Sequence, residues 1–89
     1  MIERDVEIVN RLGLHARAAA KLVQTAGGFA SRLWVVKDGD AVDAKSILGL
    51  LLLAASQGTR LTLRADGADQ EAALDAVEEL IADRFHEES

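Results

Sequence analysis

Apolar and polar residues alternate along two segments of the chain. In residues 2–9 apolar side chains occupy every second position from residue 2, except for Arg4, and acidic residues lie between them. Residues 59–65 alternate leucine with arginine and threonine in the same way. Successive side chains of a strand point to opposite faces of its sheet. Both segments are therefore predicted to be strands with one face on a hydrophobic core.

A tight turn joins two further predicted strands. Residues 31–36 are rich in β-branched and aromatic side chains, which favour extended backbone. Asp38-Gly39 is a strong signal for a two-residue hairpin turn, and residues 41–43 then form a short returning strand. We thus expect four strands in all, two of them in a hairpin.

The first two helices are predicted from runs rich in alanine and leucine. Residues 16–26 are rich in alanine, the best helix former, and Gly27-Gly28 ends this helix. Residues 47–55 form an apolar run with a single β-branched residue, which favours a helix over a strand. Ser46 precedes the run and is predicted to be its N-cap.

The last helix is predicted from residue 70 to about residue 85, after a turn at Asp66-Gly67. Asp69 is its expected N-cap, and residues 86–89 are expected to fray. The side chains that we expect to face inward from the first and last helices are Ala19, Leu22, Val23, Ala26, Ala73, Val77, Leu80 and Ile81.

The order of these elements is β-α-β-β-α-β-α. Helices that fall between the strands of a small sheet usually cover one of its faces. We therefore predict an α+β fold, an open-faced β-sandwich in which three helices pack on one face of a four-stranded, mainly antiparallel sheet. Residues 1–89 are expected to form a single domain, with Trp34 on the outer, solvated face of the sheet.

Composition narrows the class of protein. The chain has no cysteine, so it offers no disulfide or thiolate. Its charged start and the lack of a long apolar run predict a cytoplasmic protein without membrane insertion. The net charge of −5 argues against nucleic-acid binding. Residues 10–29, however, carry only basic charges (Arg11, Arg17 and Lys21), which suits an acidic partner at that place.

His15 stands between a glycine-containing loop and the start of the first predicted helix. A helix N-terminus presents unpaired N–H groups that hold anions. The imidazole is a nucleophile in its neutral form, and Arg17 carries a planar fork of donors that suits phosphate. The residues alone leave two interpretations open: His15 carries or contacts phosphate, or it merely packs or caps at the helix entry.

The second predicted helix is too apolar to be buried on all sides in so small a domain. We expect Leu50 and Leu53 to point inward and four other side chains to stay exposed, namely Ile47, Leu48, Leu51 and Leu52. An exposed apolar surface beside a reactive residue favours a docking site, with simple core packing as the alternative. Lys21 and Gln24, after Arg17 on the first helix, either meet a partner or form a solvated face.

Two motifs carry a resemblance to a known family. The segment Gly13-Leu14-His15-Ala16-Arg17, followed by Ala-Ala-Ala-Lys-Leu-Val, resembles the active-site signature of the HPr family, the histidine-containing phosphocarriers of the bacterial phosphotransferase system. Residues 43–49, with residues 54–58 after them, resemble the regulatory serine region of that family. The resemblance covers essentially the whole chain, and the two motifs together are highly specific.

The resemblance implies a function and a set of residues. His15 would accept a phosphoryl group on Nδ1 from enzyme I and pass it to a histidine of a IIA protein, with Arg17 as stabiliser. Ser46 would be a regulatory phosphorylation site for a kinase or phosphorylase. The implied protein is a monomeric carrier and not an enzyme, without cofactor or metal. The partner-binding residues would be Arg17, Ala20, Lys21, Gln24, Ile47, Leu48, Leu51 and Leu52.

One position departs from the family pattern. The family usually has proline after the arginine, where this chain has Ala18. Proline near a helix start fixes φ and lacks an N–H that would be unpaired there. We expect a slightly less rigid helix entry and retained transfer.

Three alternatives to a phosphocarrier role in sugar transport stay open. The chain could serve the nitrogen-related branch, which uses a paralogue of the carrier. It could be a regulatory domain without transfer, although His15 and Arg17 are retained. It could be a small phosphatase, but the nearest acids along the sequence, Asp5, Glu7 and Asp43, are remote from His15. That shortage of acids favours a stable phosphohistidine. His86, near the chain end, is expected to be uninvolved.

Overall fold

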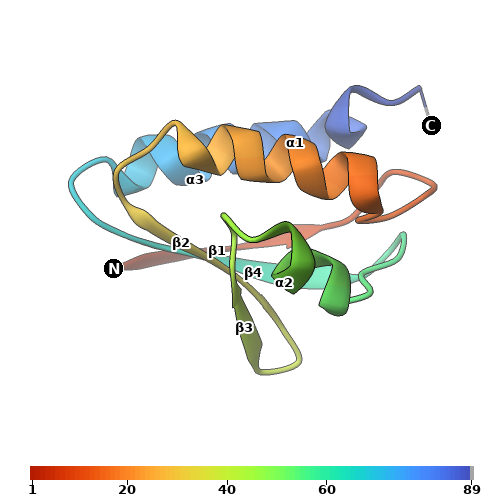
Figure 1. Cartoon of the computed structure of the whole chain (residues 1–89), viewed down its shortest axis with the longest axis horizontal. Coiled ribbons are helices and arrows are strands. Elements are labelled where there is room, and N and C mark those ends of the chain that lie inside the picture. Colours follow the sequence, from red (N-terminus) through yellow and green to blue (C-terminus); the bar gives the residue numbers. More distant parts are fainter. Residues whose placement is uncertain (89) are drawn as a thin grey trace.

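Four strands form one antiparallel sheet in the computed structural model, which describes residues 1–88 (Figure 1). They are β1 (Ile2–Glu7), β2 (Arg32–Lys37), β3 (Asp40–Asp43) and β4 (Arg60–Asp66), in the spatial order β1-β4-β2-β3. All three neighbouring pairs are antiparallel. The predicted four-stranded antiparallel sheet is therefore confirmed, with β1 ending two residues earlier than expected.

Three helices cover one face of this sheet: α1 (Ala16–Gly27), α2 (Ile47–Leu52) and α3 (Gln70–Ala82). The strands alternate in burial, so that only the face toward the helices is removed from water. The predicted open-faced sandwich is confirmed. The core side chains from the sheet, α1 and α3 are Leu33, Val35, Leu61, Leu63, Ala65, Ala18, Ala19, Leu22, Ala26, Ala73, Leu74, Val77, Leu80 and Ile81.

The other face of the sheet is polar and open to water. Arg64 Nε lies 2.7 Å from Glu3 Oε2 across the β1–β4 pair, and Thr62 donates to Asp5 at 2.9 Å. Trp34 has the parity of this face, since Leu33 and Val35 on either side of it are buried. The expected position of Trp34 on the outer face is thus confirmed.

Helix α2 is shorter than predicted. The apolar run suggested a helix to residue 55, but α2 ends at Leu52, and Ala54 has a positive φ of 51°. Leu53 and Ala55 are nevertheless buried, so the apolar pattern continues beyond the helix and hides its end. Lys37 Nζ donates to the carbonyl oxygen of Leu53 at 2.8 Å, so this backbone acceptor at the C-terminal end of α2 has a hydrogen-bond partner.

Asp69 does not cap α3 with its side chain, contrary to prediction. Its carboxylate instead accepts from the amides of Ala30 and Ser31, both at 2.9 Å, and from the Ser31 hydroxyl. The hydrogen bond from the Ser31 hydroxyl, followed by that from the Ala30 amide, lowers the pKa of Asp69 below its ordinary value. Asp69 therefore joins the start of α3 to the start of β2.

The end of the chain is ordered where fraying was expected. Helix α3 ends at Ala82, and a short 3-10 element, η1 (Arg84–His86), follows it. Phe85 is fully buried. His86 and Glu87 each form a hydrogen bond to a side chain, so the fraying prediction is wrong for these two residues. Ser89 lies outside the described residues.

Candidate functional site

His15 is the N-cap residue of α1. Its backbone is extended, and its carbonyl oxygen accepts the first hydrogen bond of the helix, from the Ala19 amide at 2.8 Å. The amides of residues 16–18 therefore have no acceptor within the helix, and they directly follow His15 along the chain. The His15 side chain does not cap the helix and is 28% exposed, so an incoming group can reach the ring.

The loop before His15 is fixed by its own backbone. Gly13 has a φ of +68°, and a Cβ at this position would lie 2.5 Å from the carbonyl oxygen of Ala55. The next amide, of Leu14, donates to that same oxygen at 2.8 Å. The buried Asn10 side chain closes the loop, because its Nδ2 donates to the Gly13 carbonyl oxygen at 2.8 Å. The entry to α1 is thus attached to the segment that follows α2.

A carboxylate contacts the imidazole from the other end of the chain. Glu87 Oε2 is hydrogen-bonded to His15 Nε2, and Glu87 Oε1 accepts from Asn10 Nδ2 at 3.0 Å. Burial raises the pKa of the Glu87 carboxyl, but the hydrogen bonds from His15 and Asn10 outweigh burial and hold this pKa below its ordinary value. Glu87 is therefore an ionised acceptor at neutral pH.

Glu87 corrects the sequence-based view that acids are remote from His15. The missed residue is 72 positions away along the chain and lies in a segment that we expected to fray. No spacing or periodicity pointed to it, because the contact depends on how the chain turns after α3. The acidic residues closest to His15 along the sequence therefore did not indicate which acidic residue contacts it in the structure.

A hollow of about 440 Å³ lies over the imidazole, lined by Leu12, His15, Ala16, Arg17 and Glu87. The Arg17 side chain is exposed and forms no hydrogen bond or ion pair with any part of residues 1–88. Its guanidinium and the free amides of the first turn of α1 bring positive electrostatic potential to the same hollow. The arrangement suits a tetrahedral anion bound to, or approaching, the ring.

Lys21 and Gln24 differ in their surroundings. Lys21 Nζ donates to the Phe85 carbonyl oxygen at 2.5 Å and so helps to hold the end of the chain. Gln24 is exposed, and Ala20 is partly buried. The structure therefore gives Lys21 an intramolecular contact that the sequence did not suggest, while Gln24 remains on the surface.

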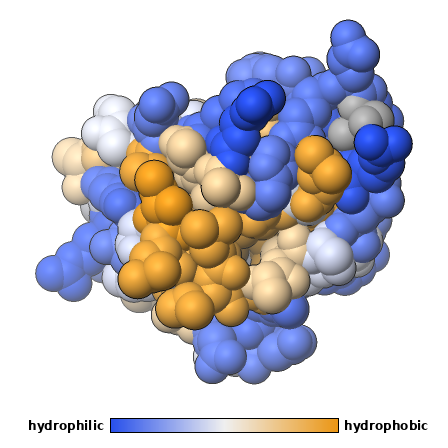
Figure 2. Space-filling view, turned by 45° about the vertical axis from the view of Figure 1, so that its right-hand side comes forward, coloured by the Kyte–Doolittle hydropathy of each residue, from blue (hydrophilic) through white to orange (hydrophobic). Residues whose placement is uncertain are grey.

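Four apolar side chains of α2 lie open to water, as predicted. Ile47, Leu48, Leu51 and Leu52 are 43%, 69%, 37% and 75% exposed, whereas Leu50 and Leu53 are buried. We call these four residues the α2 patch. Figure 2 shows apolar side chains gathered on one face of the molecule. Leu12, in the lining of the hollow over His15, adds a further exposed leucine.

Ser46 is the N-cap of α2, as predicted. Its backbone is extended, and its Oγ accepts from the Gly49 amide at 3.1 Å. The hydroxyl thus has a structural role at the entry to the helix that carries the α2 patch.

The sequence matches the family described as "PTS HPr component phosphorylation site" over residues 2–83. The chain belongs to the HPr family. Membership and the fold confirm the resemblance on which the function was predicted. HPr is a phosphocarrier protein of the phosphotransferase system.

Individual HPr proteins resemble this chain over its whole length. It is 53% identical to the phosphocarrier protein HPr of Cupriavidus necator over 98% of both chains. The crystal structure of HPr-C-His from Thermoanaerobacter tengcongensis has a TM-score of 0.96 at 49% identity, with complete coverage of both chains. The phosphocarrier protein NPr of Shewanella violacea is 44% identical over 99% of this chain and 97% of its own.

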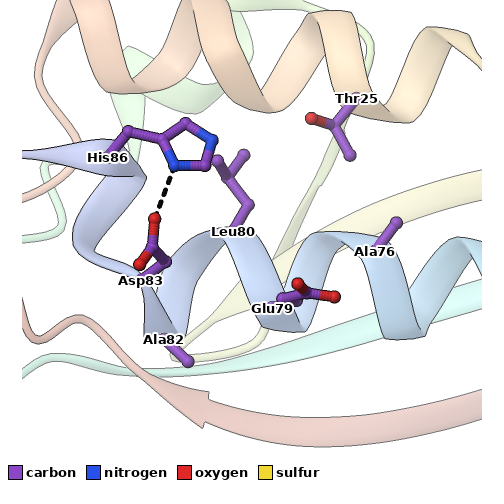
Figure 3. A pocket seen from close by; sticks show the side chains of 7 residues that line it. All are labelled: Thr25, Ala76, Glu79, Leu80, Ala82, Asp83 and His86. Atoms are coloured by element: carbon purple, nitrogen blue, oxygen red, sulfur yellow. Dashed lines mark hydrogen bonds and ion pairs between the residues drawn. The ribbon is translucent and has the colours of Figure 1, made fainter.

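A second hollow of this HPr chain, of about 590 Å³, lies between α1 and α3 (Figure 3). Its lining includes His86, whose Nδ1 lies 2.5 Å from Asp83 Oδ2, with Thr25 of α1 on the other side. No group of three metal-ligating side chains occurs in residues 1–88, and no helix there is long and apolar enough to cross a membrane. His15 and His86 thus belong to different hollows.

Proposed function

We propose that His15 is the residue through which this phosphocarrier takes up and releases a phosphoryl group. The observation that carries the proposal is the partly exposed imidazole at the N-terminus of α1, under a hollow that Arg17 also lines. Electrostatic holding of the phosphoryl oxygens is the main task of a protein in such a transfer. Arg17 and the amides of residues 16–18 would supply it.

In the transfer step only the two histidines form or break a covalent bond, while Arg17 and the amides of residues 16–18 hold the phosphoryl oxygens. The lone pair of His15 Nδ1 attacks the phosphorus of a donor phosphohistidine on enzyme I. The N–P bond of the donor breaks, and its electron pair returns to the donor imidazole. A histidine of a IIA protein then takes the phosphoryl group from His15 in the same way. The chain is thus a substrate of phosphotransfer and not an enzyme with its own turnover.

Incubation with enzyme I and ³²P-labelled phosphoenolpyruvate tests this function. We expect a stoichiometric adduct that is labile in acid and stable in base, which is the behaviour of a phosphohistidine. Addition of a IIA protein should discharge the adduct. Continuous release of inorganic phosphate from the carrier alone would contradict the proposal and support the phosphatase alternative.

We further propose that partners dock on α1 and α2 together, around His15. The surface comprises Arg17, Ala20, Lys21, Gln24 and the α2 patch. Burial of apolar surface is the main favourable contribution to most protein–protein association, and the basic charges at Arg17 and Lys21 suit an acidic partner. Nothing in this surface requires a cofactor.

Leu48→Asp is expected to weaken binding to enzyme I at least about tenfold, because it places a charge in the centre of an apolar contact. Leu48 is 69% exposed, so the fold should persist. Titration calorimetry measures the affinity, and far-UV circular dichroism checks the fold. Ala41→Asp, on the exposed β3 strand, is the control and should leave the affinity unchanged. Equal affinity of Leu48→Asp and wild type would remove the α2 patch from the docking surface.

Ser46 is proposed as a regulatory phosphorylation site for a kinase and a phosphorylase. A phosphate at the N-terminus of α2 is tolerated by the helix, but it adds about two negative charges beside the docking surface. Those charges would repel an acidic partner and slow the charging of His15.

Ser46→Asp is expected to slow phosphorylation by enzyme I about tenfold, through a lower rate of encounter with an acidic partner. Ser46→Asn is the matched control, since both aspartate and asparagine replace serine as N-caps and only aspartate adds charge. Rates of labelled phosphoryl uptake compare the three proteins. Equal rates for the aspartate and asparagine variants would show that charge at position 46 does not regulate transfer.

Two branches of the phosphotransferase system are candidates for the pathway that this carrier serves. The likeness to an NPr keeps the nitrogen-related branch as a second candidate beside sugar transport. Transfer from the labelled carrier to a sugar-specific IIA protein and to the nitrogen-related IIA protein, measured side by side, separates the two. We propose that in either branch residues 1–89 act as one monomeric, cytoplasmic domain that does not bind nucleic acid.

A further inference from the structure

The chain makes an unusual turn directly after α3. Arg84, Phe85 and His86 are three consecutive non-glycine residues with positive φ, of 57°, 54° and 63°. L-amino acids adopt this left-handed region only at an energetic cost, so a run of three such residues persists only where other contacts hold it. Two contacts do so here: the Phe85 ring is fully buried, and its carbonyl oxygen accepts from Lys21 Nζ at 2.5 Å.

This turn brings Glu87 to His15. The Glu87 carboxylate divides its two oxygens between His15 Nε2 and Asn10 Nδ2. Asn10 is itself fully buried and donates to the Gly13 carbonyl oxygen as well, so one side chain fixes both the loop before His15 and the carboxylate on it. The Glu87 side chain is only 15% exposed, although it lies near the end of the chain.

The chemistry of the two hydrogen-bonding groups determines which nitrogen of the imidazole carries the proton. An ionised carboxylate has no hydrogen to donate, so Nε2 must be the N–H donor in this pair. A neutral imidazole carries one N–H, and Nδ1 then has the free lone pair. We propose that Glu87 is a positioning residue that holds the His15 proton on Nε2 and so presents Nδ1 as the nucleophile. This inference rests on the proposed role of His15 as the phosphoryl carrier.

Glu87 also matches the charge of the phosphorylated ring. When Nδ1 forms its bond to phosphorus, the proton stays on Nε2 and the ring gains positive charge, which the carboxylate beside Nε2 stabilises. When the phosphoryl group leaves, the electron pair of the N–P bond returns to Nδ1 and the neutral imidazole is restored. No proton moves in either direction, so the same contact serves uptake and release.

The tautomer of His15 provides a direct test. We compare the ¹⁵N shifts and proton couplings of the ring in wild type, Glu87→Ala, Glu87→Gln and Glu88→Ala at alkaline pH, where imidazole is neutral. Glu87→Ala should lower the ratio of Nε2–H to Nδ1–H tautomer about tenfold, the effect of one hydrogen bond to a charged group. Glu87→Gln keeps an acceptor oxygen without the charge and should retain part of the bias. Glu88→Ala, at the exposed neighbouring position, should match wild type.

Rates of phosphoryl uptake from enzyme I should follow the same order as the tautomer ratios. An unchanged tautomer ratio in Glu87→Ala, or an equal change in Glu88→Ala, would overturn the role of Glu87. The tautomer is measured without any phosphoryl donor, so this outcome is independent of the proposed function. Phosphorylation of a His15→Ala protein would overturn the function and leave the tautomer result standing.

Discussion

His15→Ala is expected to abolish phosphoryl uptake completely. Alanine has no nucleophilic atom, and the only other histidine, His86, lies in a different hollow, where it pairs with Asp83. The fold should survive, because the imidazole is partly exposed and does not cap α1. Acid-labile label from phosphoenolpyruvate and enzyme I measures uptake, and urea unfolding measures the free energy of unfolding.

His86→Ala is the matched control for this prediction. It removes the same side chain from an exposed position on η1, outside the hollow that Arg17 and Glu87 line. We expect full labelling of the His86 variant. If His15→Ala still took up label while His86→Ala did not, the two histidines would have to exchange their assigned roles.

Gly13→Ala is expected to have the largest effect on stability among substitutions near the site. The added methyl group would lie 2.5 Å from the Ala55 carbonyl oxygen and 2.9 Å from Ser56 Cα, both of them backbone atoms that cannot turn away. Together with the positive φ of 68°, this overlap should lower the free energy of unfolding by about 2–4 kcal/mol. The entry to α1 would shift with it, so phosphoryl uptake should also slow.

Gly39→Ala separates the two causes of that loss. Gly39 has a φ of +86° in the β2–β3 turn, but a methyl group added there would meet no atom within 4 Å. Its substitution therefore carries only the backbone cost, about 1 kcal/mol, and should leave uptake unchanged. Urea unfolding of both variants gives the comparison. Equal losses at the two glycines would show that the loop before His15 is not held against Ala55.

Local patterns in the sequence were sufficient to predict the fold. The alternation in β1 and β4, the Asp38-Gly39 turn and the alanine-rich α1 each depend on neighbouring residues, and each is found in the structure. The exposure of the α2 patch followed from the same reasoning, since a single helix face cannot bury so many leucines. His15 and Arg17 could be placed at a helix N-terminus on these grounds alone.

Contacts between distant residues could not be predicted in this way. Asp69 is a good N-cap by type, yet its carboxylate binds Ala30 and Ser31 across the fold. The leucine run did not show where α2 ends, because Leu53 and Ala55 remain buried beyond it. Glu87 reaches His15 only because Phe85 is buried and turns the chain. These contacts form only in the assembled tertiary structure, so a local sequence pattern does not predict them.

The single tryptophan of the chain is an intrinsic fluorescence probe that reports on one face of the sheet only. Trp34 lies on the face of the sheet away from the helices, beside Arg64 of β4 and Asp43 of β3. Its fluorescence will change when the strands separate in denaturant. The imidazole of His15 lies on the opposite side of the sheet, so phosphorylation there should leave the tryptophan emission nearly constant. Tryptophan fluorescence therefore measures unfolding, whereas phosphorylation of His15 has to be followed with a label placed elsewhere.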